Sequence, residues 1–196
     1  HLGLHSGIIT DTVQPLIESG LIDNSTKMHS AGISVTSMAG GTQDFYRFLH
    51  RNPAVEFHPC SHTHDSQVLA RIDRLCAVNS VLQVDLEGNA NAEQANGRCV
   101  SLPGGLPDFA AGAAHAPRGM SIIALRSTSG TELRSNIVAK LDRNAPVTVG
   151  AHDIDFVVTE YGVAPLRGLP PAARAAALVA VAHPAHREDL RRARAQ

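Results

Sequence analysis

The stretch LCAVNSVLQVDLEG, residues 75–88, decides how this chain is interpreted. Its apolar residues are almost continuous and partly β-branched, which is typical of strands buried in a sheet. We therefore expect two strands here, or one bent strand, in the middle of a sheet. Asn79 is the polar exception, because an amide among apolar neighbours needs hydrogen-bond partners or costs about 1–3 kcal/mol. It is predicted either to hold a substrate carbonyl or to satisfy the backbone.

On either side of this stretch, the apolar spacing alternates between that of strands and that of helices. Such alternation predicts the α/β class, with a parallel or mixed β-sheet flanked by helices. In the first predicted helix, Asp11 and Gln14 are interpreted as a capping box and Gly20 as the end. Further strands are predicted at residues 2–7, 30–38, 55–57, 120–128 and 156–162, and further helices at residues 42–51, 68–72, 169–182 and 184–195.

Composition excludes several classes of function. The 196 residues carry a formal net charge of −1, which provides no broad field for nucleic acid. The longest weakly polar stretch, residues 172–186, is too short to span a bilayer and includes Arg174. Three cysteines, Cys60, Cys76 and Cys99, stand at no ligand-like spacing, which predicts reduced thiols and a cytoplasmic location.

A glycine-rich turn in SLPGGLPDFAAGAA, residues 101–114, is the first candidate site. Gly104 and Gly105 let the backbone approach a ligand, and the helix predicted after them directs free N–H groups at it. The turn therefore suits an oxyanion or a phosphate, although a Gly-Gly pair taken alone is more often only a turn.

A carboxylate at the end of a predicted strand is the second candidate. In VVTEYGVAPLRG, residues 157–168, a β-rich run brings Glu160 to its end, where ligands bind in open parallel sheets. Glu160 is predicted to orient a reacting group or to act as a general base, if burial or a neighbour tunes its pKa. The alternative is an ion pair with Arg167.

A histidine-rich segment, FHPCSHTHD at residues 57–65, is the third candidate. A zinc site is one interpretation, but the regular spacing of the donors and the intervening Pro59 favour an exposed loop. The potential donors are His58, Cys60, His62, His64 and Asp65.

Seven segments, in order, resemble the C-terminal domain of the acetyl-CoA hydrolase/transferase family. The resemblance covers essentially the whole chain and implies the second half of a family I-type CoA-transferase fold, so residues 1–196 are expected to form that domain without its N-terminal α/β partner. The segments are LGLHSGIITD, NPAVEFHPCSHTHD, AVNSVLQVDLEGNANAE, PGGLPDFAAGA, SIIALRST, DFVVTEYGVAPLRG and AHPAHREDL.

The resemblance also implies a chemistry, together with a departure from it. In the family's transferases a glutamate attacks the acyl-CoA thioester and then carries CoA as a glutamyl thioester. That glutamate belongs to a motif resembling H-T-E-x-x-x-D, which is matched here by His5, Ser6, Gly7 and Asp11. Gly7 thus stands in the place of the nucleophile and has no side chain to acylate.

Other positions match the family's site more closely. The resemblance implies that Asn79 lies beside the reacting carbonyl, that Glu160 lies near the active centre and that the Gly105 amide is an oxyanion donor. Contacts to the CoA ester are implied for the segment made of Gly104, Gly105, Asp108 and Phe109.

Three functions remain open from the sequence. The first is acetyl-CoA or other acyl-CoA hydrolysis, or CoA transfer to a carboxylic acid, by direct attack of water or the acid with Glu160 as the base. The second is a catalytically inactive module that binds CoA esters. The third is a metal-binding hydrolase that uses residues 58–65. The expected partners are an acyl-CoA and a short-chain carboxylic acid, with no permanently bound cofactor and a homo-oligomer for the two-domain protein.

Overall fold

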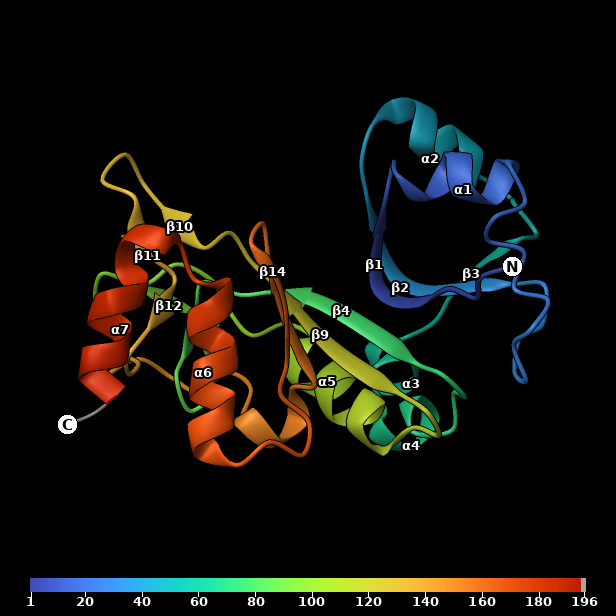
Figure 1. Ribbon diagram of the computed structural model, residues 1–196. Coiled ribbons are helices and arrows are strands. Elements are labelled where there is room, and N and C mark those ends of the chain that lie inside the picture. The colour runs from blue at the N-terminus through green and yellow to red at the C-terminus, as the bar shows by residue number, and fades with distance from the viewer. Residues whose placement is uncertain (195–196) are drawn as a thin grey trace.

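The computed structural model describes residues 1–194, in which strands and helices alternate along the chain (Figure 1). The N-terminal part forms a parallel three-stranded sheet in the order β1-β2-β3. Its elements are β1 (His5–Thr10), α1 (Val13–Glu18), β2 (Ser34–Gly40), α2 (Gln43–Leu49) and β3 (Val55–Phe57).

Helices cover one face of this N-terminal sheet and pack on its buried apolar side chains. Ile9 on β1 is buried and packs with Phe45 on α2 and Val55 on β3, so the two helices lie on one face (Figure 1). The short helix α3 (Cys60–Thr63) contacts β1 and β2. β1 therefore contacts both the layer formed by α1 and α2 and the histidine-rich segment.

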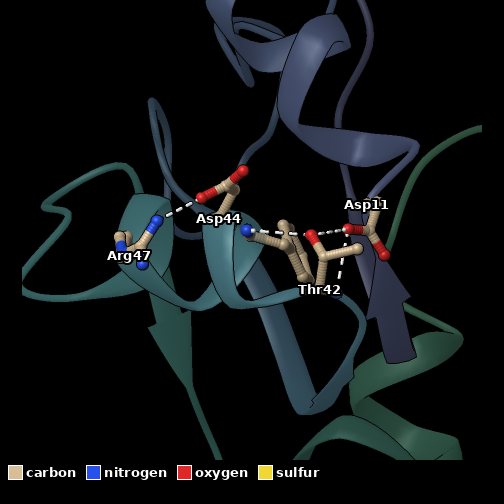
Figure 2. Close-up of polar contacts among 5 residues, drawn as sticks. Asp11, Thr42, Asp44 and Arg47 are labelled. Atoms are coloured by element: carbon tan, nitrogen blue, oxygen red, sulfur yellow. Dashed lines mark hydrogen bonds and ion pairs between the residues drawn. The ribbon is translucent and has the colours of Figure 1, made fainter.

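The predicted capping box at the first helix is wrong. Thr12 is the N-cap of α1 and its side chain accepts no capping hydrogen bond, whereas Gly20 with φ 73° follows the helix end as expected. The Asp11 carboxylate instead accepts hydrogen bonds from the Thr42 N–H, at 3.0 Å, and from the Thr42 hydroxyl (Figure 2). Thr42 in turn caps α2 by accepting from the Phe45 N–H. Asp11 thus ties the end of β1 to the start of α2.

The remaining chain builds two sheets, two small hairpins and the helices around them. The larger sheet has the order β14-β13-β9-β4, in which β4, β9 and β13 are parallel, and the smaller has the order β12-β5-β6. The strands are β4 (Cys76–Ser80), β5 (Gln83–Asp85), β6 (Ala90–Asn91), β7 (Gln94–Ala95), β8 (Arg98–Cys99), β9 (Met120–Ala124), β10 (Thr128–Ser129), β11 (Arg134–Ser135), β12 (Ile137–Val138), β13 (Phe156–Thr159) and β14 (Gly162–Pro165).

Helices cover these sheets and close the core (Figure 1). The largest apolar cluster joins β9, β13 and α6 through Ile123, Val157 and Leu178, each of which is fully buried. A second cluster joins α4 and α5 through Leu69 and Ala113. The helical elements are α4 (Ser66–Leu69), α5 (Leu106–His115), η1 (Ala151–Asp153), α6 (Pro171–Val181), η2 (Pro184–His186) and α7 (Arg187–Arg194).

The stretch that opened the sequence analysis forms two strands, as predicted, but they belong to different sheets. β5 is the middle strand of the smaller sheet, whereas β4 lies at the edge of the larger one. Val78 on β4 is 62% exposed, so the apolar run is not wholly buried. A long apolar run does not distinguish a central strand from an edge strand that faces a cavity.

The α/β class is confirmed, with mixed sheets and flanking helices. The predicted end of the last helix at Ala195 lies outside the described residues. Within residues 1–194, no helix is long and apolar enough to cross a membrane.

Candidate active site

A cavity of about 1220 Å³ lies against β1, β4 and the start of α5. It is lined by residues 1–8, 26–30, 71–79 and 104–106, and by a few single side chains from neighbouring elements. Gly7, Asn79, Gly104 and Gly105 all belong to this lining, so the structure brings together four of the residues singled out by the sequence.

Gly7 and Gly105 both lie against one imidazole ring, that of His64. A Cβ placed on Gly7 would lie 2.8 Å from His64 Nε2 and 3.1 Å from its Cε1. A Cβ on Gly105 would lie closer still to Nε2. The ring therefore occupies the space into which a side chain at position 7 would extend.

A hydrogen-bonded chain holds this ring. His64 Nδ1 lies 2.9 Å from the Thr63 hydroxyl, which also contacts the Ser37 hydroxyl. Thr63 is fully buried, and the edge of the Phe109 ring packs against His64 with a centroid separation of 5.3 Å. Across residues 1–194, no protein group hydrogen-bonds to His64 Nε2. His64 lines the cavity, and no described group competes with a ligand for this nitrogen.

The Gly104-Gly105 turn presents the start of α5 to the cavity. Gly104 has φ 56°, a left-handed conformation that favours glycine, and Gly105 is the N-cap residue. Neither amide N–H donates a hydrogen bond to another described residue. Two free N–H groups at a helix N-terminus are suited to stabilise an oxyanion.

The other two residues expected to contact the CoA ester behave differently. Phe109 is buried in the α4–α5 core and lines the cavity beside His64. Asp108 is exposed in the first turn of α5 and does not belong to the lining. Its position suits the helix dipole better than a ligand contact.

Asn79 lies near the carboxyl end of β4, where it is half-buried. No hydrogen bond to its side chain is formed within residues 1–194. The amide therefore does not serve the backbone, which was one of the two roles predicted for it, and it faces the cavity instead.

Glu160 follows β13 at the same end of the larger sheet, two strands away from β4, but it does not line the cavity. Its Oε2 accepts a hydrogen bond from the Ser127 N–H at 2.9 Å, and its Oε1 accepts one from the Ser127 hydroxyl at 2.7 Å. These bonds lower the pKa of Glu160, the hydroxyl most strongly. The prediction that Glu160 is the base in this cavity is therefore not supported, because Glu160 lies outside the lining and its lowered pKa makes it a weaker base than usual.

The alternative role for Glu160, an ion pair with Arg167, is also wrong. The Arg167 guanidinium bonds to both oxygens of Asp155, with Nη2 to Oδ2 at 2.6 Å. Asp155 is 4% exposed, and its carboxylate pairs with the guanidinium that was predicted as a partner of Glu160.

The donors of the histidine-rich segment do not converge. Within the described part of the chain, no three His, Cys, Asp or Glu side chains are placed to hold a metal ion. Asp65 caps α4 by accepting from the N–H groups of Gln67 and Val68, and His58 lies 3.0 Å from the Glu56 carboxylate. The metal-dependent hydrolase is therefore not supported.

Two basic groups of the cavity lining, Lys27 and His5, have lowered pKa values. Burial lowers the pKa of Lys27 to about 8, while its Nζ donates to the carbonyl oxygens of Leu4 and Ile33 at 2.9 and 2.7 Å. Burial also lowers the pKa of His5, whose Nε2 lies 3.0 Å from the Thr63 carbonyl oxygen. No sequence pattern pointed to Lys27, and His64 was a candidate only as a donor in the metal alternative. The glycine at position 7 is the available clue that another group fills that space.

Comparisons with known proteins agree on one family. A family model described as the acetyl-CoA hydrolase/transferase C-terminal domain matches residues 41–194. A 4-hydroxybutyrate coenzyme A transferase from Clostridium kluyveri is 39% identical over 97% of this chain and 44% of its own length. A more distant relative, an acetyl-CoA hydrolase from Saccharomyces cerevisiae, is 27% identical over 94% of this chain and 34% of its own length.

A solved structure shows the same arrangement. RipA from Yersinia pestis superposes with a TM-score of 0.91 at 35% identity, over 98% of this chain and 43% of that protein. The chain therefore spans less than half the length of these relatives.

Proposed function

The chain belongs to the acetyl-CoA hydrolase/transferase family, and we propose that its cavity binds an acyl-CoA thioester and cleaves it without a covalent bond to residue 7. The observation that carries this proposal is the shared lining. Gly7, Asn79, Gly104 and Gly105 face one space, and the residue in the place of the family's nucleophile has no side chain.

In this proposal the cavity stabilises the tetrahedral intermediate. The free N–H groups of Gly104 and Gly105 donate to the oxygen that becomes negative as the thioester carbon is attacked. The Asn79 amide donates to the same carbonyl or orients the acyl group. Preorganised donors of this kind each contribute about 10²–10³ in rate.

The attacking group is a carboxylate in one route and water in the other. An acid substrate attacks the thioester as the carboxylate, which forms a mixed anhydride and releases CoA thiolate. The thiolate then attacks the anhydride carbonyl that came from the acid substrate. The products are a new thioester and the carboxylate of the first acyl group. No proton moves in that route. Water must lose a proton as it attacks, so hydrolysis needs a base.

We further propose that residues beyond this chain complete the CoA site. The curated and solved relatives are more than twice as long as the region they share with this chain, and the cavity is larger than about 1000 Å³, the upper range of an enclosed ligand pocket. A second α/β domain over this cavity would exclude water from it. The substrates are short-chain acyl-CoA esters and short-chain acids, as the names of the relatives suggest.

The test supplies acetyl-, propionyl- and succinyl-CoA to the full natural chain, with and without acetate. Free thiol reports hydrolysis, and mass spectrometry of the CoA esters reports exchange. Release of thiol without an acid indicates hydrolysis, and a new ester only with acetate indicates transfer. Binding of a thioether analogue with neither reaction would instead identify an inactive module that binds CoA esters, and the proposed activity would be rejected.

A further inference from the structure

We propose that His64 is the general base that activates water for thioester hydrolysis in this cavity. The inference rests on the proposed function and supplies what that function lacks, because Glu160 lies outside the lining. It starts from the position of His64 Nε2 between Gly7 and Gly105, in the space that a side chain at position 7 would fill.

The distances place Nε2 beside both glycines. A Cβ on Gly7 would lie 2.8 Å from Nε2, and a Cβ on Gly105 would lie closer still to the same nitrogen. A thioester oxygen bound to the Gly105 N–H therefore has Nε2 as its neighbour. A general base must reach the proton it takes within about 2.6–3.2 Å, directly or through one water.

The partners of the ring allow the required tautomer. The Thr63 hydroxyl has one hydrogen and two oxygen neighbours besides His64 Nδ1, namely the Ser37 hydroxyl and the Pro59 carbonyl oxygen at 3.5 Å. When that hydrogen points to either oxygen, Nδ1–H donates to Thr63 and Nε2 carries the lone pair. The buried Thr63 then orients the base, as a third group orients the histidine in other hydrolases.

The step balances without a metal or an oxidant. Nε2 takes a proton from water while the water oxygen bonds to the thioester carbon, and the Gly105 N–H stabilises the resulting oxyanion. Collapse breaks the carbon–sulfur bond, and the imidazolium returns the proton to the departing sulfur, which gives the CoA thiol. The carboxylic acid formed loses its proton to solvent.

Two variants and a matched control test this role in the full natural chain. His64→Gln removes the base, and we expect the kcat of acetyl-CoA hydrolysis to fall about 100- to 1000-fold. Binding of a thioether analogue should persist. His58→Gln is the control, because His58 lies on the same segment, contacts Glu56 and does not line the cavity. That control should hydrolyse at the rate of the natural chain.

Rescue and acceptor dependence separate catalysis from a structural role. His64→Gly leaves the space of the ring empty, so added imidazole should restore hydrolysis in proportion to its concentration. Because a carboxylate attacks without losing a proton, transfer to acetate should survive His64→Gln while hydrolysis does not.

The outcomes distinguish the two proposals. If the natural chain releases thiol and His64→Gln does so equally fast, the base is another group and only this inference fails. A hydroxylamine-sensitive acyl group on His64 would make the ring a nucleophile and would also overturn it. If the natural chain neither hydrolyses nor exchanges any acyl-CoA, the proposed function fails and the role of His64 fails with it.

Discussion

Two polar groups, Glu160 and His64, differ in which of their atoms remain free of hydrogen bonds to the protein. The Glu160 carboxylate after β13 has both oxygens bound by Ser127. The His64 imidazole beside β1 has only Nδ1 bound, by Thr63, and its Nε2 lies at the cavity between two glycines. The Glu160 carboxylate already has hydrogen-bond partners within the protein, whereas His64 Nε2 has none among the described residues.

The difference shows that residue type alone does not identify a reactive group. A carboxylate at a strand end is a good candidate base by the rule for open sheets, yet hydrogen bonds lower the pKa of Glu160. His64, in the histidine-rich segment that does not form a metal site, has a free ring nitrogen and lines the cavity.

Adding a methyl group at Gly105 should displace the His64 ring from its position in the cavity. Gly105 has φ −84°, which alanine adopts without strain, but the new Cβ would overlap His64 Nε2. The ring must rotate away, so we expect Gly105→Ala to lower the kcat of hydrolysis about 100-fold, the scale of losing a general base. Steady-state kinetics of thiol release measures this loss.

Gly104→Ala provides the contrasting control. Its φ of 56° is strained for alanine, but no atom lies within 4 Å of the added Cβ. We expect a loss of about 1–2 kcal/mol in the free energy of unfolding, with His64 left in place and a smaller loss of hydrolysis than in Gly105→Ala. Equal losses of activity in the two variants would mean that the turn, rather than the ring, matters.

The pH dependence of the free energy of unfolding should show that burying the charged Lys27 destabilises the folded chain. Its pKa is lowered to about 8 from 10.5, so between these values the unfolded chain holds a proton that the folded chain has lost. The free energy of unfolding therefore increases with pH in that window, by about 1–2 kcal/mol after allowance for partial exposure.

Lys27→Met isolates this effect. The variant should lack the increase between pH 8 and 10.5 that the natural chain shows in urea unfolding. It should also lose the two hydrogen bonds to Leu4 and Ile33, so its stability is compared as a slope against pH and not as an absolute value. If the free energy of unfolding had the same slope against pH in both proteins, burial would not be lowering the pKa of Lys27.

Glu160→Gln should have the smallest effect on the reaction. The amide oxygen still accepts from the Ser127 N–H, so we expect kcat within about threefold of the natural chain, whereas loss of a general base costs about 100-fold or more. Because its pKa is lowered from 4.5, Glu160 contributes stability above that pH and loses it as the pH falls through the lower folded value. The variant should therefore be less sensitive to acid, and a 100-fold loss of kcat would restore Glu160 as the base.

Part of the site could be predicted because its signals are local. The Gly104-Gly105 turn precedes a helix in the sequence, and its free N–H groups follow from that order alone. Asn79 stands out within an apolar strand, and its position near the strand end follows from the strand's length. Gly104, Gly105 and Asn79 line one cavity.

The sequence by itself determined the α/β class, the alternation of elements and the absence of a side chain at position 7. These depend on residue spacing and on chemistry within a few neighbouring residues. Only the tertiary structure decided that His64 fills the space beside Gly7, and that Ser127 occupies the oxygens of Glu160. Both contacts join residues 33 or more positions apart, and such pairs are set by how the sheets and helices pack, since nothing in the local sequence specifies the partner.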